Sequence, residues 1–324
     1  ILLNEIGLDP GIDHMSAMSL IDNIKNQGGE ICSFKSFCGG LIHPDYDDNP
    51  WNYKFTWNPR NVVLAGQGTA QYIKNGKYKN VPYNKLFERL DIMTVLDAGK
   101  FEGYANRDSL SYRKSYSIEN IPTIYRGTLR KEGFCKSWNI FVQLGMTDDT
   151  YIMNNCKNMT YRDFTNSFLP FDTIKNVEEK FCDYLGISET SEEFAKIKWL
   201  GMFSNEKINL SNVSPAMVLQ LILEKKWTLS NEDKDMVVMQ HQFEYKLEGD
   251  SKRINSSLLV YGDDSMNTAM AKTVGLPVGI ATKLILNGDV KSKGVVIPTL
   301  SEIYIPVLQE LKNYNIDFIE ELVV

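Results

Sequence analysis

Two long stretches in the second half of the chain limit the folds that are open to it. The segments DMVVMQHQFEYKL and RINSSLLVYGD are rich in β-branched and aromatic residues and follow each other closely. They predict an antiparallel pair of long strands over about 235–247 and 252–261. Because helices and other strands surround this pair, the sequence favours an α+β arrangement over a pure doubly wound sheet.

Helix and strand patterns alternate along the rest of the chain, without repeats, low-complexity tracts or a clear linker. Helices are predicted at about 13–26, 134–144 and 174–185, from Ser214-Pro215, within LPVGIATKLILNG up to Gly288, and over SEIYIPVLQELKNYN. Strands are predicted at ILLNEIGL, which we expect to be buried, and at ICSFKSFC, FEGYANRDSL, TIYRGTLRKEGF and IDFIEELVV. The expected fold class is therefore α/β with α+β character, built on a mixed or antiparallel sheet.

Composition excludes several classes of function. The formal net charge of −6 and the pI of about 5.3 argue against a nucleic-acid binder, which needs a basic surface. The odd count of five cysteines, without a CxxC pair, argues against a disulfide framework or a thiolate zinc site, and three scattered histidines give no metal-ligand spacing. No apolar run looks long enough to cross a membrane. We expect a reduced, cytoplasmic protein without a bound metal.

The nearest match to a dinucleotide-binding loop is AGQGTAQ, in which Gly66 and Gly68 form a GxG. The third glycine position of the fingerprint is occupied by Gln71, and no acidic residue ends a partner strand at the right distance. We interpret the segment as an ordinary loop.

A carboxylate stands at the joint between the first strand and the first helix. Asp9 precedes Pro10 and Gly11, a combination that shapes turns, and it could cap the helix that follows. It could equally be a functional carboxylate, since ligands of α/β proteins bind at the carboxyl ends of strands. Asp13 and His14 lie in the first helical turn, where we expect structural roles.

Arginines offer a second candidate site. Arg107 follows a predicted strand, and strand alternation in TIYRGTLRKEGF places Ile124, Arg126, Thr128 and Arg130 on one face. Guanidinium groups bind carboxylates with two parallel hydrogen bonds, although a lone arginine near a strand end is usually a surface ion pair. Two further arginines, Arg60 and Arg113, add to this set.

Aromatic residues recur at every second position of a long loop that we expect to be ordered. Trp51, Tyr53, Phe55 and Trp57 are compatible with a face toward the core and with a face toward a partner. Cys38, next to two glycines, is interpreted as a small buried apolar residue.

Several stretches together resemble one family, the glutamate-forming saccharopine dehydrogenases, also called saccharopine reductases. These stretches are NEIGLDPGIDHMSAM, SFKSFCGGL, NPWNYKFTWNPR, NRDS, YRGTLRKEGF, DMVVMQHQF and TVGLPVGIATKLILNG. They occur in the family's order from the first residues of the chain to its last. The resemblance implies interconversion of saccharopine with glutamate and α-aminoadipate semialdehyde, in lysine metabolism, with NADP or NAD as the cofactor.

The family's dinucleotide-binding domain is assembled from two parts of the chain, and its Gly-rich loop lies upstream of the GLDPG segment. The resemblance therefore implies that residues 1–12 and 263–324 are the remnant of a Rossmann-like cofactor domain and that 13–262 form a substrate-binding and dimerisation domain. We expect a truncated chain that lacks most of the cofactor site and is inactive alone, from an enzyme that forms homodimers.

The resemblance also implies roles for individual residues. The family's substrate contacts map onto Asp9, Arg107, Thr128, Leu129 and Arg130. Its remaining cofactor contacts map onto Leu8, Asp9, Pro10 and Asn58. Saccharopine carries three carboxylates and a secondary amine, so arginines suit it, and Asp9 is expected to hold or exchange the proton of the amine. Asn52 and Asn58 depart from the family's usual glycine and small hydroxyl residue.

Two alternatives remain open from the sequence. One is a carboxynorspermidine-type dehydrogenase, whose substrate carries fewer carboxylates and so has less need of the two arginines. The other is a binding or dimerisation module without chemistry. The long strands at about 235–247 and 252–261 could form a dimer interface or be covered by the chain's own helices.

Overall fold

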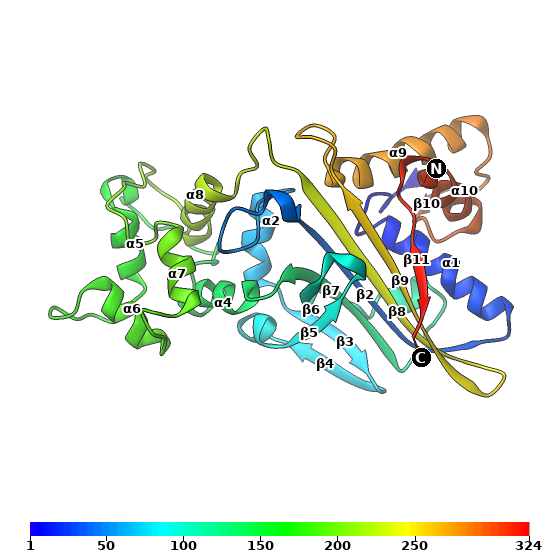
Figure 1. Cartoon of the computed structure of the whole chain (residues 1–324), viewed down its shortest axis with the longest axis horizontal. Helices are drawn as coiled ribbons and strands as arrows, with labels where there is room; N and C mark the ends of the chain where they lie inside the picture. The colour runs from blue at the N-terminus through cyan, green and yellow to red at the C-terminus, as the bar shows by residue number, and fades with distance from the viewer. Residues whose placement is uncertain (324) are drawn as a thin grey trace.

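A nine-stranded mixed sheet runs through the middle of the computed structural model, which describes residues 1–323 (Figure 1). The strand order is β11-β9-β8-β2-β7-β3-β4, and β7 also pairs with β6, which pairs with β5. The strands are β2 (Glu30–Ile42), β3 (Ala70–Lys74), β4 (Lys77–Val81), β5 (Leu90–Thr94), β6 (Lys100–Ala105), β7 (Thr123–Lys131), β8 (Asp235–Leu247), β9 (Asp250–Tyr261) and β11 (Ile319–Leu322). Strands β2 and β7 run parallel, and the other pairs are antiparallel.

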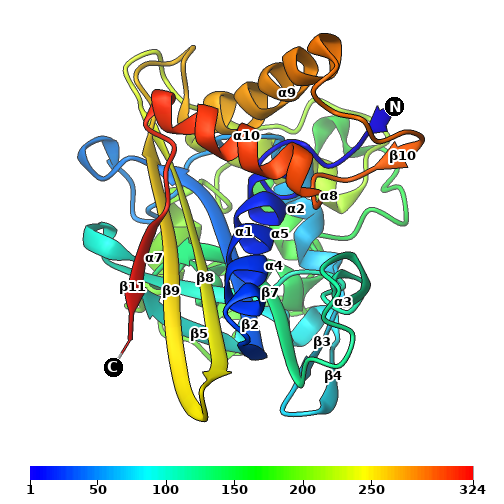
Figure 2. The same ribbon diagram turned by 90° about the vertical axis from the view of Figure 1, so that its right-hand side faces the viewer.

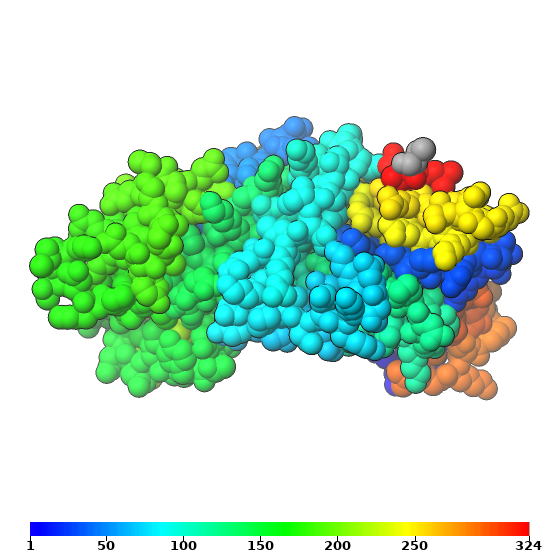
Figure 3. All heavy atoms as spheres, turned by 90° about the horizontal axis from the view of Figure 1, so that it is seen from below, coloured from blue at the N-terminus to red at the C-terminus, as the bar shows by residue number. Residues whose placement is uncertain are grey.

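Helices gather at the two ends of this sheet. At one end lie α1 (Ile12–Asn26), α9 (Ala269–Asn287) and α10 (Ser301–Leu311), beside a two-stranded pair of β1 (Leu2–Leu3) and β10 (Val295–Val296) (Figure 2). The other end is a helical lobe (green in Figure 3). It comprises α4 (Phe134–Leu144), α5 (Tyr161–Ser167), α6 (Val177–Leu185), α7 (Glu192–Trp199) and α8 (Pro215–Trp227). Two short helices, α2 (Pro59–Leu64) and α3 (Tyr112–Ser115), connect strands.

The sheet carries two apolar cores, and the alternation of side chains along each strand determines in which core a residue packs. Phe37 of β2 and Leu129 of β7 pack in the core that includes the helical lobe, whereas Phe34 and Ile124 pack in the core under α1. The lobe's core contains a cluster of aromatic rings. Its members include Trp51, Tyr53, Phe55, Phe134, Trp138, Phe141 and Trp227. The aromatic loop is therefore ordered and faces the core, apart from Trp57, which is 43% exposed.

Several elements agree closely with the sequence-based prediction. The long antiparallel pair β8–β9 is confirmed, with Met236 opposite Tyr261 at one end and Leu247 opposite Asp250 at the other. Helix α8 begins where expected, because Ser214 Oγ accepts a hydrogen bond from the backbone N–H of Met217. The mixed sheet itself is confirmed.

One prediction about the first half of the chain is wrong, and one hairpin there was not predicted. The opening apolar run is not a buried strand, since only Leu2 and Leu3 pair, with β10, and Leu2 is 66% exposed. The hairpin of β3 and β4 was not expected, because residues 77–80 of β4 are exposed and give no apolar alternation. Its turn, Asn75-Gly76, has positive φ at both residues, and this dipeptide is the usual signal for such a hairpin.

Helix α9 corrects the expectation that no segment could cross a membrane, because its length and composition alone meet that requirement. A packed helix of a globular fold meets the same test, and α9 packs against α10 and β8. Its two lysines are also tied to neighbouring elements: Lys272 pairs with Asp263, and Lys283 pairs with Glu310. These contacts account for α9 as part of this fold.

A buried histidine lies beneath α1. Ser16 Oγ donates to the carbonyl of Ile12 (2.7 Å) and lies 2.7 Å from Nε2 of His241 on β8, so the ring N–H points to Ser16. The other ring nitrogen, Nδ1, has no hydrogen-bond partner. Burial lowers the pKa of His241 to about 4, and nearby Arg126 lowers it further although Asp13 opposes this. The imidazole is therefore neutral at pH 7.

His241 should make the protein less stable in mild acid. Its pKa is about 4 in the folded chain against an ordinary value of 6.5, so the unfolded chain binds more protons between these pH values. The free energy of unfolding should therefore fall as the pH drops from about 6.5 to about 4, by up to ~1.4 kcal/mol per pH unit from this group.

Urea unfolding at pH 7 and pH 4.5 checks this in wild type and His241→Gln. Other titrating groups act in both proteins, so the difference between them isolates His241, and the variant should lose less stability on acidification. His43→Gln, at a partly exposed histidine, is the control and should behave like wild type. Equal losses in wild type and His241→Gln would contradict the assignment.

Phe37 should dominate the stability of the central sheet. Its side chain is fully buried between the rings and strands around Tyr125, and Phe→Ala at such a site costs about 3–5 kcal/mol because it leaves a cavity. Phe171→Ala is the matched control, because Phe171 is 95% exposed and its loss should change stability by less than ~0.5 kcal/mol. Denaturant midpoints of the two variants provide the measurement.

Candidate functional site

The turn that carries Asp9 is tight and depends on glycine. The backbone N–H of Gly7 donates to the carbonyl of Pro10 (3.1 Å), and the Asp9–Pro10 peptide bond is cis. Gly11 has a φ of +149°, and a Cβ at this position would lie 2.0 Å from the carbonyl oxygen of Gly7. Only glycine fits there. Helix α1 begins at the next residue, so the turn brings Asp9 and Asp13 to the same place.

The cation at this place is Arg126 of β7. Its Nη2 pairs with Oδ1 of Asp9 and lies 3.2 Å from Oδ2 of Asp13. The guanidinium also stacks on Tyr112, with Cζ 4.0 Å from the ring centre. The sequence indicated Arg126 only as one of several arginines. Its place on the alternating face of TIYRGTLRKEGF was the available signal, and the structure shows that this face meets the Asp9 turn.

The pKa values of the two carboxyl groups are shifted in opposite directions. Burial raises the pKa of Asp9 to about 6, and repulsion by Asp13 adds to this while Arg126 opposes it. Burial would also raise the pKa of Asp13, but His14, Arg126 and the N–H of Gly11 together hold it below its usual value. Asp9 is therefore the group that can gain or lose a proton near neutral pH.

Cys38 belongs to the same surroundings. It lies on β2 opposite Thr128 of β7, and its side chain is buried. Burial raises the pKa of this thiol well above its usual range, and the negative charges of Asp9 and Asp13 raise it further. Cys38 is therefore a neutral thiol near the two carboxyls. The sequence predicted that it is buried but not that it lies beside two acids.

Arg130 lies further along β7 and is 3% exposed. Its guanidinium Cζ is 4.9 Å from the ring centre of Tyr53, 5.4 Å from that of Phe134 and 5.9 Å from that of Tyr104. One nitrogen, Nη1, donates to the carbonyl of Leu129 (2.8 Å), whereas Nε has no hydrogen-bond partner. No carboxylate of the described residues lies within ion-pair distance of it. A buried cation without a counter-ion is costly, so this is a place for an anionic ligand group.

Other polar groups near Arg130 are also without partners. The hydroxyls of Tyr53 and Thr56 are buried and accept or donate no hydrogen bond of normal geometry. Thr56 packs on Gly40 of β2, where a Cβ would lie 2.6 Å from the Thr56 hydroxyl, and the neighbouring Gly39 packs on the backbone of Leu129. The Gly39-Gly40 pair therefore lets this loop and β7 lie close against β2.

Arg107 lies apart from Arg130. It is exposed, has a φ of +46°, and lines an open cavity of about 470 Å³. The other lining residues are Thr69, Ala70, Gln71, Asn80, Val81, Pro82 and Asp108. The backbone N–H of Asn106 donates to the carbonyl of Arg126, so Arg107 belongs to the Arg126 end of β7. Along a strand the separation from Arg126 to Arg130 is roughly 13 Å. The structure thus spreads its cations along β7.

The remaining predicted site residues lie around these groups in different ways. Leu8 is buried and Pro10 is exposed on either side of Asp9. Asn58 is exposed, and its Oδ1 accepts the backbone N–H of Arg60 (2.9 Å) to cap α2. Thr128 is partly exposed on the face of Arg126 and Arg130. The side chain of Leu129 packs in the core that includes the helical lobe, so only its backbone is available to a ligand.

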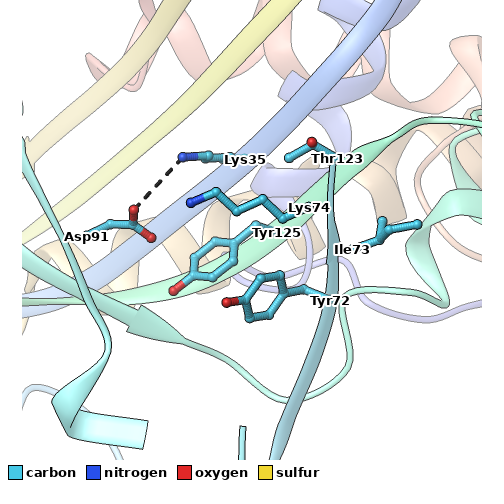
Figure 4. Close-up of a pocket in the computed structure, with 7 residues that line it drawn as sticks. All are labelled: Lys35, Tyr72, Ile73, Lys74, Asp91, Thr123 and Tyr125. Carbon is cyan, nitrogen blue, oxygen red and sulfur yellow. Dashed lines mark ion pairs between the residues drawn. The ribbon is translucent and has the colours of Figure 1, made fainter. Parts of the chain in front are cut away.

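A second cavity lies on the other face of β7 and is too small for a substrate. It holds about 20 Å³, room for one water molecule (Figure 4). Lys35 Nζ is 3.9 Å from Oδ1 of Asp91 across it. Its other lining residues are Tyr72, Ile73, Lys74, Thr123 and Tyr125.

Comparison with known proteins identifies the family of the chain. The family model described as the saccharopine dehydrogenase C-terminal domain matches residues 7–316. Saccharopine dehydrogenase [NADP(+), L-glutamate-forming] of Schizosaccharomyces pombe is 34% identical over 335 residues, which cover 100% of this chain and 74% of that protein. The mitochondrial α-aminoadipic semialdehyde synthase of Rattus norvegicus is 36% identical over 326 residues, 98% of this chain but only 35% of that protein. The chain thus spans about a third of the rat relative's length.

The solved structure of apo saccharopine dehydrogenase (L-Glu forming) from Saccharomyces cerevisiae superimposes with a TM-score of 0.88 at 34% sequence identity. The match covers 99% of this chain and 74% of the yeast chain. The mixed sheet and its helices are therefore those of a known enzyme fold. The motif order in the sequence, the family match and the shared structure lead to one conclusion: the chain belongs to the saccharopine dehydrogenase C-terminal domain family.

Proposed function

We propose that this chain is the substrate-binding part of a glutamate-forming saccharopine dehydrogenase. Such an enzyme reduces the imine of α-aminoadipate semialdehyde and glutamate to saccharopine and catalyses the reverse reaction. One observation carries the proposal: Arg130 is a buried guanidinium without a carboxylate partner, on the strand face that also bears Arg126 and meets Asp9. The relatives' names, which refer to saccharopine and aminoadipic semialdehyde, support it.

The side chains suit a long substrate with several carboxylates. Arg130 would bind one carboxylate inside its aromatic surroundings, where low polarity strengthens the ion pair. Arg107, at the Arg126 end of the strand, would bind another from its open cavity. The backbone of Thr128 and Leu129 would lie between them along β7. Asp9 would then lie beside the nitrogen of the substrate.

Asp9 is suited to holding the proton that the nitrogen needs. An imine accepts hydride more readily as the protonated iminium, and a carboxyl with a raised pKa can deliver that proton near neutral pH. A nicotinamide cofactor, NADP or NAD, supplies the hydride when it is bound. Leu8 and Pro10 flank Asp9 and Asn58 is exposed, so these residues are placed to contact a cofactor that lies over the turn.

We also propose that residues 1–12 and 263–324 belong to the cofactor-binding unit and 13–262 to the substrate-binding unit. Exposed apolar side chains on the elements at the α9 end support this, because such a surface is normally covered. They include Leu2, Val274, Val278, Leu286, Val295 and Ile305. On this proposal the 324 residues alone do not turn over substrate.

Homodimer formation and a cytoplasmic location remain proposals of the same kind. Strand β11 pairs with residues 254–257 of β9, and Val323 N–H donates to the carbonyl of Arg253, so a second copy would pair with the part of the β9 edge beyond these residues. All five cysteines are free, which supports a reducing compartment. The carboxynorspermidine-type alternative gains no support from the relatives' names. A dimerisation module that binds no ligand would leave the unpaired Arg130 unexplained.

Arg130→Gln should weaken saccharopine binding to this chain by about 10- to 100-fold, because a charge-assisted hydrogen bond contributes about 1.5–3 kcal/mol. Isothermal titration calorimetry measures the dissociation constant directly. Arg89→Gln, which removes an exposed arginine in the same way, is the matched control and should bind like wild type. If Arg130→Gln and wild type bind saccharopine equally, Arg130 is not a ligand-binding residue.

Asp9→Asn should reduce turnover by about 10²- to 10⁴-fold in a complete enzyme that joins this chain to a cofactor-binding half. Saccharopine binding should change little, since asparagine keeps the size of the side chain. Asp22→Asn is the control, because Asp22 lies on α1 and accepts a hydrogen bond from Tyr304 far from the site. Steady-state rates with saccharopine decide the matter, and unchanged turnover in Asp9→Asn would rule out the proton role.

A further inference from the structure

We propose that Asp13 is a positioning residue that fixes the proton of the carboxyl pair on Asp9. Arg126 and the backbone N–H of Gly11 favour Asp13 as the carboxylate, so the proton that the pair retains in mild acid lies on Asp9. The value of this arrangement for turnover rests on the function proposed above, but the location of the proton does not. Sequence analysis gave Asp13 a purely structural role at the start of a helix.

The geometry distinguishes the two carboxyls. Both oxygens of Asp13 have donors: Oδ1 accepts from Gly11 N (2.6 Å) and Oδ2 from Arg126 Nη2 (3.2 Å). The side chain is 2% exposed, so it is ionised only because these donors replace water. The hydrogen bonds to Asp9 from the described residues reach Oδ1 alone, from Arg126, and its side chain is 18% exposed. Its Oδ2 accepts no hydrogen bond from these residues, so it is the oxygen that can carry the proton.

Close contact between the two carboxyls disfavours ionisation of both, so the second one ionises at a higher pH than a lone carboxyl would. They lie close enough to hydrogen-bond to each other, and two carboxylates in such contact do not both ionise readily. One guanidinium, Arg126, serves both. Because Asp13 has the additional N–H of Gly11, its ionised form is favoured and its negative charge disfavours ionisation of Asp9.

The neighbouring titratable groups do not change this balance in favour of Asp9. His14 lies 2.7 Å from Glu5 through Nε2 and 2.8 Å from the hydroxyl of Tyr116 through Nδ1, and its charge lowers the pKa of Asp13, which adds to the effect of Arg126. Tyr112 lies between the guanidinium of Arg126 and the ring of His14, whose centre is 5.3 Å away. The remaining groups on this side are the hydroxyls of the two tyrosines, the thiol of Cys38 and the imidazole of His241. Burial raises the pKa of the hydroxyls and the thiol and lowers that of His241 to about 4. They are neutral at pH 7.

The consequence for the proposed reaction is a stored proton. The O–H bond of Asp9 would break as the N–H bond of the iminium forms, and hydride from the nicotinamide cofactor would then reduce the carbon. The carboxylate that results lies beside Arg126, which limits the cost of its charge. In the reverse direction Asp9 would accept the proton again. Asp13 would stay ionised throughout.

Titration of the Asp9 carboxyl in this chain tests the proposal without substrate or cofactor. Carbon-13 NMR of protein labelled at the aspartate carboxyls follows each group, and Asp9→Asn assigns its signal. In wild type the midpoint of Asp9 should be near 6 and that of Asp13 below 3.8. Asp13→Asn, which keeps an acceptor for Gly11 N–H but removes the charge, should lower the Asp9 midpoint by at least about one pH unit.

Arg126→Gln should move the Asp9 midpoint in the opposite direction, upward, because it removes the cation, and Arg126→Lys should restore most of the wild-type value. Asp22→Asn on the same helix should leave it unchanged. If Asp13 only capped the helix, Asp13→Asn would leave the Asp9 midpoint unchanged. Circular dichroism confirms that each variant is folded.

An Asp9 midpoint near 3.8 in wild type, or one that Asp13→Asn does not lower, would overturn the proposal. The wild-type titration decides it even if a variant fails to fold, since it shows directly which carboxyl holds the proton. In a complete enzyme, Asp13→Asn should shift the pH profile of turnover to lower pH by the same amount. If the NMR shift occurs and the pH profile does not move, the proton placement stands and the catalytic role proposed for Asp9 fails.

Discussion

The pairing of one guanidinium with two carboxyls holds the site together. Arg126 extends from β7 to Asp9 in the turn before α1 and to Asp13 in the first turn of α1. It thereby connects the central sheet to the segment that covers it. Burial strengthens these ion pairs, and it also makes the loss of either partner costly, because a buried charge must be compensated. Burial and these contacts also separate the pKa values of the two acids, raising that of Asp9 and lowering that of Asp13. The contact that holds the turn in place therefore also leaves Asp9 able to exchange a proton.

The rest of the fold keeps this contact in place. Strand β2 lies between β7 and β8, and α1 packs against it. All residues of α1 from Ile12 to Met18 are buried. Such a helix cannot shift without moving Ser16 away from His241 on β8. The aromatic cluster around Trp227 fixes the loop that supplies Tyr53 to Arg130. Apolar packing on both faces thus sets the positions of the charged groups.

The sequence predicted the parts of this structure that local patterns encode. The apolar spacing of α1, the alternation of β7 and the cap of α8 depend on neighbours in the chain, and each is confirmed. What failed depends on tertiary surroundings. The opening apolar run looks buried but has little to cover it, and β4 is polar because its residues face outward. Nothing local distinguishes Arg126 from the other arginines, or shows that Cys38 lies beside two acids.

The two arginines of β7 show why burial alone does not identify a functional residue. Arg126 and Arg130 are both almost inaccessible and lie on one face of one strand. Arg126 has its carboxylates within the chain, so its burial is explained by structure. Arg130 has aromatic rings and one backbone carbonyl but no anion, and its Nε is unpaired. No contact within the chain offsets the free energy of burying this charge, whereas a bound anionic group would offset it. Arg130, which has no anionic partner, therefore indicates where a ligand binds. Arg126, which pairs with Asp9, indicates where the proton transfer takes place.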